Sequence, residues 1–588
     1  MRELAWALRI RAMRPQSTLH PRFRATALLL TLTFAISCAT TGTPARPADT
    51  RPAAAASTAR PGITNPVAQL VSSPDGVAAS ATTQATEVGA RVLAEGGTAV
   101  DAAVAIGFAL AVTEPSMSGL GGRASVILRH PDGRIIGIDG LNQVPNSYKE
   151  KSGLPDPYER AAIPGVPAAL GELLATHGTW PLARVLAPAI ALAENGFILG
   201  EGEAARWAAA QEELAKFGAG VGTYLKPDGS LWKAGERPTN PLLAATLRRL
   251  AAEGIDSFYR GSIAADIDAD MAARGAFLRK EELAAYRAQP AILVTGTYRG
   301  HTLTSNFRPA AGHAVIQALQ TMEGLAVPGP TEPARWASVI GQAMHHALTD
   351  RGTRRGTEAE SAAWLTSIDH ARERATKIVM PPRTEVSTPA PAREDFSAVV
   401  AGTLVMAPTD REATTHYAVA DRQGRVVSLT QSLGPAMGTR LVAPKLGFMY
   451  ATRLGTVPGS RPASAIAPTL VQPPGGGVVA LGGAGDSRII SAVIQVISRM
   501  VDHKMSLAEA MAAPRVHPDD AKTMRIEEGP AVSWPEGDRA KLAAWHPGLV
   551  GAPSGYFGRV HAVWVPPSGP AVASAETRWT GGAAAPIR

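Results

Sequence analysis

The stretch that decides the fold is ATTHYAVADRQGRVVSLTQSL, residues 413–433. Residues 415–420 and 426–433 are rich in valine, threonine and other strand-favouring residues, so they predict two β-strands. Residues 421–424 (Asp-Arg-Gln-Gly) lie between them and supply turn chemistry, with Gly424 able to take a positive φ. The stretch therefore predicts a β-hairpin within a chain of 588 residues.

Thr414 stands at the leading edge of this hairpin. A cut between Ala413 and Thr414 would leave Thr414 with a free α-amine beside its own hydroxyl group. Such an amine has a pKa of about 7.7–8.0, so near neutral pH it can take the hydroxyl proton and activate the oxygen as a nucleophile. The alternative is that Thr414 and Thr415 are ordinary strand residues, because threonine favours strands.

Short motifs in a fixed order accompany this hairpin over about 70–520. In that order they resemble the γ-glutamyltranspeptidases, a family of N-terminal-nucleophile hydrolases whose small subunit begins like the segment from Thr414. The motifs are 96–102 (GGTAVDA), 114–115 (EP), 118–122 (SGLGG), 163–167 (IPGVP), 186–190 (LAPAI), 258–261 (FYRG), 298–300 (YRG), 461–462 (RP), 486–490 (DSRII) and 512–517 (AAPRVH).

The resemblance implies a four-layer αββα sandwich in the α/β class. It implies one precursor that cuts itself into a large subunit, 65–413, and a small catalytic subunit, 414–588. The large subunit would end in a mobile segment at about 381–413, within which 398–405 could pair as a strand. No metal or organic cofactor is implied.

The resemblance also assigns roles in the site. Thr414 is the expected nucleophile and Thr415 its neighbour, while Ser432 stands where the family has a threonine that orients the nucleophile. Ser432 has an alternative reading as a solvent-facing strand hydroxyl, in line with Ser428 and Thr430 at period two. Ser464 matches the first of two serines that contact the substrate.

A glycine-rich turn at 482–486 (Gly-Gly-Ala-Gly-Asp) joins an expected strand, 477–481, to an expected helix, 487–501. Backbone N–H groups at a helix N-terminus attract negative charge. The resemblance makes Gly485 and Asp486 the oxyanion hole for acyl transfer. The turn has neither the Gly-Lys-Ser/Thr of a Walker loop nor the acidic partner of a dinucleotide site, and a merely structural turn is the other reading.

The positions that grip a γ-glutamyl group depart from the family. Leu141 replaces the carboxylate-binding arginine, Gly434 the asparagine, and Thr456 the aspartate that binds the amine. Two arginines, Arg123 and Arg453, appear where the family is uncharged, and both are candidates to bind another anionic acyl group. Taken singly, each is more simply read as solvent-facing. Ala465 replaces the second serine, and the loop at 455–460 is short, which predicts a more open pocket.

The net charge of +8 does not indicate a nucleic-acid partner. Residues 1–37 hold six arginines against Glu3, which leaves only +3 for the rest of the chain. Residues 1–37 combine this basic start with a short apolar run, 25–36, and so predict a signal peptide. Cys38, the single cysteine, ends a sequence like a bacterial lipobox. We therefore expect lipidation at Cys38 and a disordered tether over 38–64, with ordinary cleavage beside an incidental cysteine as the alternative.

Elsewhere the pattern predicts helices at 85–93 and 102–112, a hairpin from 125–128 and 135–138, and mostly helix over 165–350. The expected protein is an exported enzyme of the bacterial periplasm or outer membrane, anchored to the membrane by lipid. It would transfer or hydrolyse the acyl group of a small γ-glutamyl or other acyl amide. The alternatives are an acylase of the cephalosporin/glutaryl type and a non-catalytic surface lipoprotein derived from the family.

Overall fold

The computed structural model describes residues 69–150, 156–383, 413–529, 532–578 and 581–586. The predicted signal peptide, Cys38, the tether and the possible strand at 398–405 lie outside these residues. Among the described residues, no helix is both long enough and apolar enough to cross a membrane.

Two seven-stranded sheets, antiparallel throughout, form the centre of the structure. The first has the order β17 (Gly582–Ala584), β2 (Gly76–Ser80), β8 (Ala413–Asp421), β9 (Val426–Gly434), β3 (Arg123–Arg129), β4 (Ile135–Gly140) and β5 (Gln289–Pro290). The second has the order β1 (Leu70–Ser73), β16 (Ala571–Ser574), β15 (Arg559–Val565), β11 (Val478–Ala484), β10 (Thr469–Gln472), β7 (His301–Asn306) and β6 (Leu293–Tyr298). A small third sheet contains β12 (Val516–Pro518), β13 (Thr523–Glu527) and β14 (Gly548–Ala552).

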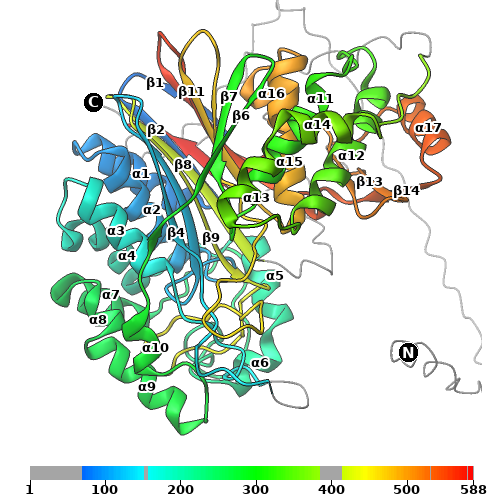
Figure 1. Cartoon of the computed structure of the whole chain (residues 1–588). Coiled ribbons are helices and arrows are strands. Elements are labelled where there is room, and N and C mark those ends of the chain that lie inside the picture. Colours follow the sequence, from blue (N-terminus) through cyan, green and yellow to red (C-terminus); the bar gives the residue numbers. More distant parts are fainter. Residues whose placement is uncertain (1–68, 151–155, 384–412, 530–531, 579–580, 587–588) are drawn as a thin grey trace, which may run out of the picture. The chain divides into compact units, whose positions relative to one another are not determined.

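Helices cover the outer face of each large sheet (Figure 1). The group on the first sheet is α1 (Thr83–Ala94), α2 (Ala99–Thr113), α3 (Val166–His177), α4 (Leu182–Asn195), α5 (Glu201–Ala209), α6 (Gln211–Lys216), α7 (Pro241–Glu253), α8 (Asp256–Tyr259), α9 (Ser262–Ala273) and α10 (Lys280–Ala285). The group on the second side is α11 (Gly312–Glu323), α12 (Pro333–Asp350), α13 (Glu358–Leu365), α14 (Ile368–Ala375), α15 (Ser487–Asp502), α16 (Leu507–Ala512) and α17 (Glu536–Trp545).

Three apolar cores lie between these layers. One lies between α1–α3 and the first sheet and continues into α4–α10. A second lies between the second sheet and α11, α15 and α16, and it continues into α12, α13 and α17. The third lies between the two sheets and contains small aliphatic side chains such as Ala418, Ala480 and Val563. Helix, sheet, sheet and helix therefore follow one another, which confirms the predicted αββα sandwich.

Most of the expected elements are present. The hairpin at the centre is β8 and β9, and the helices at 85–93 and 102–112 are α1 and α2. The expectation of mostly helix over 165–350 omitted the hairpin β6–β7. Its side chains alternate between buried and partly or fully exposed positions over Leu293–Tyr298, a two-residue period that an Ala- and Leu-rich context concealed.

Both large sheets draw strands from each side of the expected cut. In the first sheet, β8 and β9 lie between β2 and β3, and in the second, β10 lies between β11 and β7. Two pieces cut at Ala413–Thr414 would thus share both sheets and all three cores. They cannot separate without exposing those cores, so a cut chain should keep its fold.

Candidate active site

Thr414 lies at the start of β8, in the middle of the first sheet, and is 3% exposed. Its partner across the strand pair is Ser432 on β9, whose other neighbour is Arg123 on β3. The register slips between Ala413 and Thr414, so that Ala413 pairs with Gly434. Three strands that are distant in sequence thus place these side chains together, with an irregularity at the expected cut.

The hydroxyl group of Ser432 is the centre of this cluster. It donates to the carbonyl oxygen of Ala413 at 2.6 Å and accepts from Thr414 Oγ1 at 3.2 Å. It also accepts from the backbone N–H of Gly434 at 3.0 Å and from Nη2 of Arg123 at 3.2 Å. Ser432 is fully buried, so the solvent-facing reading of this residue is wrong. Its side chain points toward the second sheet, as do Ser428 and Thr430, because all three lie on the same face of β9.

Thr415 points to the opposite face of β8. Tyr417 and Val419, at the same alternation, belong to the core under α2, whereas Ala418 and Ala420 belong to the core between the sheets. Thr414 therefore faces the second sheet, and Thr415 faces α2. The two threonines have different surroundings, although they are neighbours in sequence.

The turn expected to form an oxyanion hole follows β11. Gly482 and Gly483 belong to β11 itself, so the turn is shorter than the sequence predicted and consists of Gly485 and Asp486. A Cβ on Gly482 would lie 2.5 Å from Cε1 of His416, so close packing between the sheets explains that glycine. Gly485 has φ +123° and Asp486 has φ +55°, conformations that expose backbone N–H groups at the start of α15.

Arg488 holds this turn from the side. Its Nε donates to the carbonyl oxygen of Gly485 at 2.9 Å, and its guanidinium group lies 4.6 Å from the ring centre of Tyr556. Ser464, by contrast, makes local contacts: its N–H donates to Pro309 and its hydroxyl accepts from the N–H of Ile466. Within the described residues, no hydrogen bond links Ser464 to Thr414.

The two unexpected arginines differ in position. Arg123 is 1% exposed and contacts Ser432, so the solvent-facing reading is wrong for this residue. A Cβ on Gly434 would lie 3.7 Å from Arg123 Nη2, so the glycine leaves this space open beside the guanidinium group. Arg453 is half-buried; its guanidinium group lies 3.7 Å from the ring centre of Tyr148 and donates to the carbonyl oxygen of Gly455. Arg453 therefore braces the short loop.

Leu141 and Thr456 provide no charge. Leu141 is buried, and its carbonyl oxygen accepts from the hydroxyl of Tyr286 at 2.7 Å. Thr456 is exposed on the loop.

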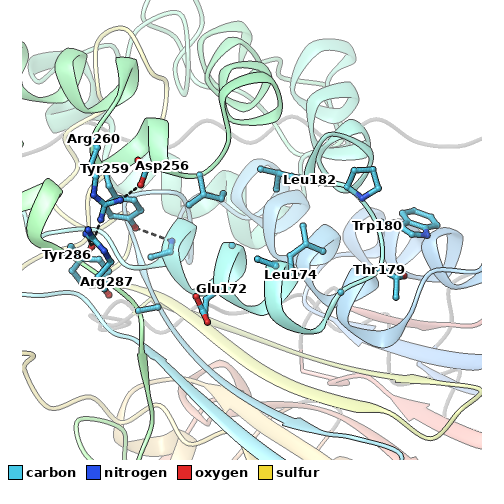
Figure 2. A pocket seen from close by; sticks show the side chains of 17 residues that line it. Glu172, Leu174, Thr179, Trp180, Leu182, Asp256, Tyr259, Arg260, Tyr286 and Arg287 are labelled. Atoms are coloured by element: carbon cyan, nitrogen blue, oxygen red, sulfur yellow. Dashed lines mark hydrogen bonds and ion pairs between the residues drawn. The ribbon is translucent and has the colours of Figure 1, made fainter.

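The described residues contain no cluster of side chains suited to a metal ion. A cavity of about 770 Å³ along α3 runs from Trp180 to Tyr259 and Arg287 (Figure 2), but none of the expected site residues lines it.

The 512–517 motif proves to be structural. Arg515 and Arg578 form a fully buried ion network with Glu527 and Glu576, with nitrogen–oxygen distances of 2.6–3.0 Å. The two carboxylates balance the charge of the two guanidinium groups, as a buried charge requires, and backbone carbonyl groups such as that of Met511 accept from both arginines. Sequence reasoning missed one residue beside the nucleophile, Glu114, which appeared only as part of a two-residue motif. Its buried carboxyl group lies next to Thr415.

Comparison with known proteins agrees with this geometry. A family model described as Gamma-glutamyltranspeptidase matches residues 85–586. The glutathione hydrolase proenzyme of Escherichia coli (strain K12) is 31% identical over 531 residues, which cover 81% of this chain and 87% of that protein. The acylase ACY 1 proenzyme of Pseudomonas sp. (strain SE83) is 32% identical over 468 residues, which cover 74% of this chain and 80% of that protein.

Among solved structures, the cephalosporin acylase from Bacillus halodurans matches with a TM-score of 0.74 at 26% identity. The match covers 90% of this chain and 99% of that one. The sheets, the central hairpin and the family match therefore agree. The chain is an enzyme that belongs to the γ-glutamyltranspeptidase family of N-terminal-nucleophile hydrolases.

Proposed function

We propose that the protein cuts itself between Ala413 and Thr414 and then uses Thr414 as an N-terminal nucleophile on small acyl amides. The observation that carries this proposal is the Ser432 hydroxyl, which is hydrogen-bonded to both the Ala413 carbonyl oxygen and Thr414 Oγ1. Both partners of the first chemical step thus meet at one side chain, in a buried site where such contacts are strong.

In the self-cleavage step, Thr414 Oγ1 attacks the carbonyl carbon of Ala413. The new carbon–oxygen bond replaces the carbon–nitrogen bond, and the hydroxyl proton passes to the departing nitrogen. Ser432 polarises the carbonyl oxygen and stabilises its negative charge, as an oxyanion-hole donor does. Water then hydrolyses the ester, which leaves Ala413 as a carboxylate and Thr414 with a free α-amine.

In the acyl-transfer step, the α-amine of Thr414 takes the proton of its own hydroxyl as the oxygen attacks the substrate amide. The backbone N–H groups of Gly485 and Asp486 would stabilise the tetrahedral intermediate. The amine then protonates the leaving group, and water or an acceptor amine releases the acyl group from Thr414. Ser432, freed from Ala413, is left to orient the nucleophile.

The altered recognition positions favour an acyl group other than γ-glutamyl. Leu141 and Gly434 have no charge to offer, and Thr456 is an exposed neutral residue. An α-ammonium group buried there would lack an acidic partner, which is unfavourable. Arg123, a buried cation that donates to Ser432, is our candidate anchor for a carboxylate on the acyl group. Ser464 and Arg453 remain candidate substrate contacts on sequence grounds.

A second candidate function is an acylase of the cephalosporin or glutaryl type. Relatives that are named acylases match this chain as well as a glutathione hydrolase does. A glutaryl group has the carboxylate that Arg123 can bind and lacks the amine that the site does not bind. The non-catalytic alternative, a surface lipoprotein, predicts a chain that stays whole.

The experiment is a denaturing gel and intact mass of the purified wild type and of Thr414→Ala, followed by assays with γ-glutamyl, glutaryl and aromatic-acyl anilides. We expect two pieces for the wild type, with Thr414 as the new N-terminus, and one piece for the variant. An uncut wild-type chain, or a cut elsewhere, would refute the nucleophile assignment.

We also propose export through the signal peptide 1–37 and lipid anchoring at Cys38. The basis is sequence alone: a basic start, a short apolar run and a lone cysteine before a tether. Cys38→Ser should move the protein from the membrane fraction to the soluble fraction. Equal membrane association of the wild type and Cys38→Ser would refute the proposed lipid anchor, but it would not affect the proposal of export.

A further inference from the structure

Glu114 lies behind the nucleophile strand. It caps the C-terminus of α2, a helix in which every residue is buried, and its own side chain is 2% exposed. The carboxyl group meets the hydroxyl of Thr415, the residue that follows Thr414 on β8. Thr414 and Thr415 point to opposite faces of the strand, so Glu114 approaches Thr414 from the face opposite to Ser432.

Both polar groups at this contact lack partners. Oε2 of Glu114 and Oγ1 of Thr415 are buried, and neither has a hydrogen-bond partner of ordinary geometry among the described residues. Unpaired buried polar atoms are rare in folded proteins and call for a functional explanation. The two groups are neighbours, because the Thr415 hydroxyl lowers the pKa of the Glu114 carboxyl group.

The charged groups around Glu114 come from two elements. Glu203 and Arg206 on α5 form an ion pair at 2.7 Å, and Arg559 lies on β15. Burial raises the pKa of Glu114 to about 7; Glu203 also raises it, and Arg206, Thr415 and Arg559 lower it. Glu203 itself accepts from Ser116, Arg206 and Trp207, so its oxygens are paired. Glu114 is thus a buried carboxyl group that titrates near neutral pH.

A separate cavity of about 210 Å³ leads to this carboxyl group. It is lined by Glu114, Glu203, Arg206 and Thr113, and it opens beside the exposed Thr83 and Ile198. Protons can therefore reach Glu114 from solvent through this cavity.

We propose that Glu114 is a positioning residue for Thr414: through Thr415 it fixes the start of β8, and its ionised form holds a proton on the Thr414 α-amine. The proposal rests on the proposed function, because that amine exists only after the cut. Glu114 does not contact the substrate, and its effect is on the pKa of the Thr414 α-amine.

The direction of the effect follows from charge. An ionised carboxylate near an ammonium group favours the ammonium form and raises its pKa. Because Glu114 lies against Thr415, the residue next to Thr414, its charge should shift the pKa of the α-amine by on the order of one unit. Replacing Glu114 by a neutral residue of the same shape should therefore lower the pKa of the α-amine, and the amine should act as a base at lower pH.

The test compares Glu114→Gln with wild type in two ways. The first is the acid limb of kcat/KM against pH, which reports the base of the free enzyme. The second needs no substrate: it is the pH dependence of acylation of the Thr414 α-amine by an acid anhydride, read from the mass of the N-terminal peptide. Glu114→Gln should move both curves to lower pH by about one unit.

Three further variants serve as controls. Glu203→Gln removes the neighbouring carboxylate that raises the pKa of Glu114, so it favours the ionised form of Glu114 and should not move either curve to lower pH. Glu114→Asp keeps a titrating group and should stay near wild type. A pure packing role would make Glu114→Asp and Glu114→Gln behave alike. Thr415→Val, a variant that also serves if Glu114→Gln does not mature, removes the hydroxyl that favours the ionised form and should shift both curves in the same direction by less.

The outcomes separate the two proposals. A wild-type chain that stays whole overturns the proposed function, and this inference with it. A cut chain whose α-amine titrates at the same pH in wild type, Glu114→Gln and Thr415→Val overturns the role of Glu114 alone.

Discussion

The region around the nucleophile and the region expected to recognise the acyl group differ in both sequence and structure. Thr414, Ser432 and Arg123 lie on three adjacent central strands, whose hydrogen-bonded register fixes their separation. Leu141, Arg453 and Thr456 lie on connecting segments outside the strands. On the sequence prediction, the first region keeps the family residues at Thr414 and Thr415, and the second has replaced them. Chemistry placed on a rigid sheet persists while loops change the substrate.

The largest effect is expected from the nucleophile. Thr414→Ala removes the attacking oxygen, so self-cleavage should stop and kcat/KM should fall by about 10⁶-fold, as for other lost nucleophiles. Gel and kinetics on the same preparation measure both effects. Residual activity within tenfold of wild type would mean that Thr414, on the central sheet, is not the nucleophile.

Ser432 comes next. Ser432→Ala removes the donor to the Ala413 carbonyl oxygen, and self-cleavage should slow by about 10²- to 10³-fold, as for one lost oxyanion donor. Ser432→Thr keeps the hydroxyl and should cut at nearly the wild-type rate. The half-time of conversion from one band to two is the measurement. Equal half-times for all three proteins would contradict the role of this hydroxyl.

Substitution of Arg123 tests whether a residue of the central sheet also binds the substrate. Arg123→Gln removes a charged donor, so kcat/KM for a glutaryl anilide should fall by about 10- to 100-fold more than for an uncharged acyl anilide. Arg453→Gln, the matched control on the loop, should change this ratio by less than about threefold, because Arg453 contacts Tyr148 and Gly455 and not Ser432. A larger effect at Arg453 would assign recognition to the loop.

The smallest effect concerns the α-amine of the substrate. Since Gly434 and Thr456 carry no charge, removing the amine should change kcat/KM by less than about tenfold, which is less than a buried charge partner would impose. The measurement is kcat/KM for γ-glutamyl and glutaryl anilides side by side, with glutathione as a further donor that should be poor. A strong preference for the γ-glutamyl compound would show that other groups bind the amine.

Prediction from sequence succeeded where the signal was local or ordered. Residues 413–433 form the expected hairpin, and the order of the motifs indicated the family that the comparisons confirm. It failed where distant residues meet. The solvent-facing readings of Ser432 and Arg123 assumed open strand faces, but the second sheet covers one face and α2 the other.

The short turn after β11 shows the same limit. Gly482 and Gly485 appear in one glycine-rich run, yet Gly482 makes room for His416 between the sheets, and Gly485 opens the turn at α15. The sequence shows both glycines in one motif. Their roles differ because each meets a different part of the fold, which the sequence alone does not display. The roles of all the expected site residues stay predictions: Thr414, Thr415, Ser432, Gly485, Asp486, Ser464, Arg123 and Arg453.

The sequence by itself determined the family and the central hairpin, and it predicted the loss of charge at the glutamyl positions. These depend on residue types and their order, which a single chain displays directly. Only the tertiary structure decided that Arg123 and Glu114 approach the nucleophile from its two sides. Arg123 and Ser432 are 309 residues apart and meet through strand pairing, while Glu114 reaches β8 from the end of a buried helix. Burial then sets the charge state of such groups, because desolvation acts only once the chain has folded around them.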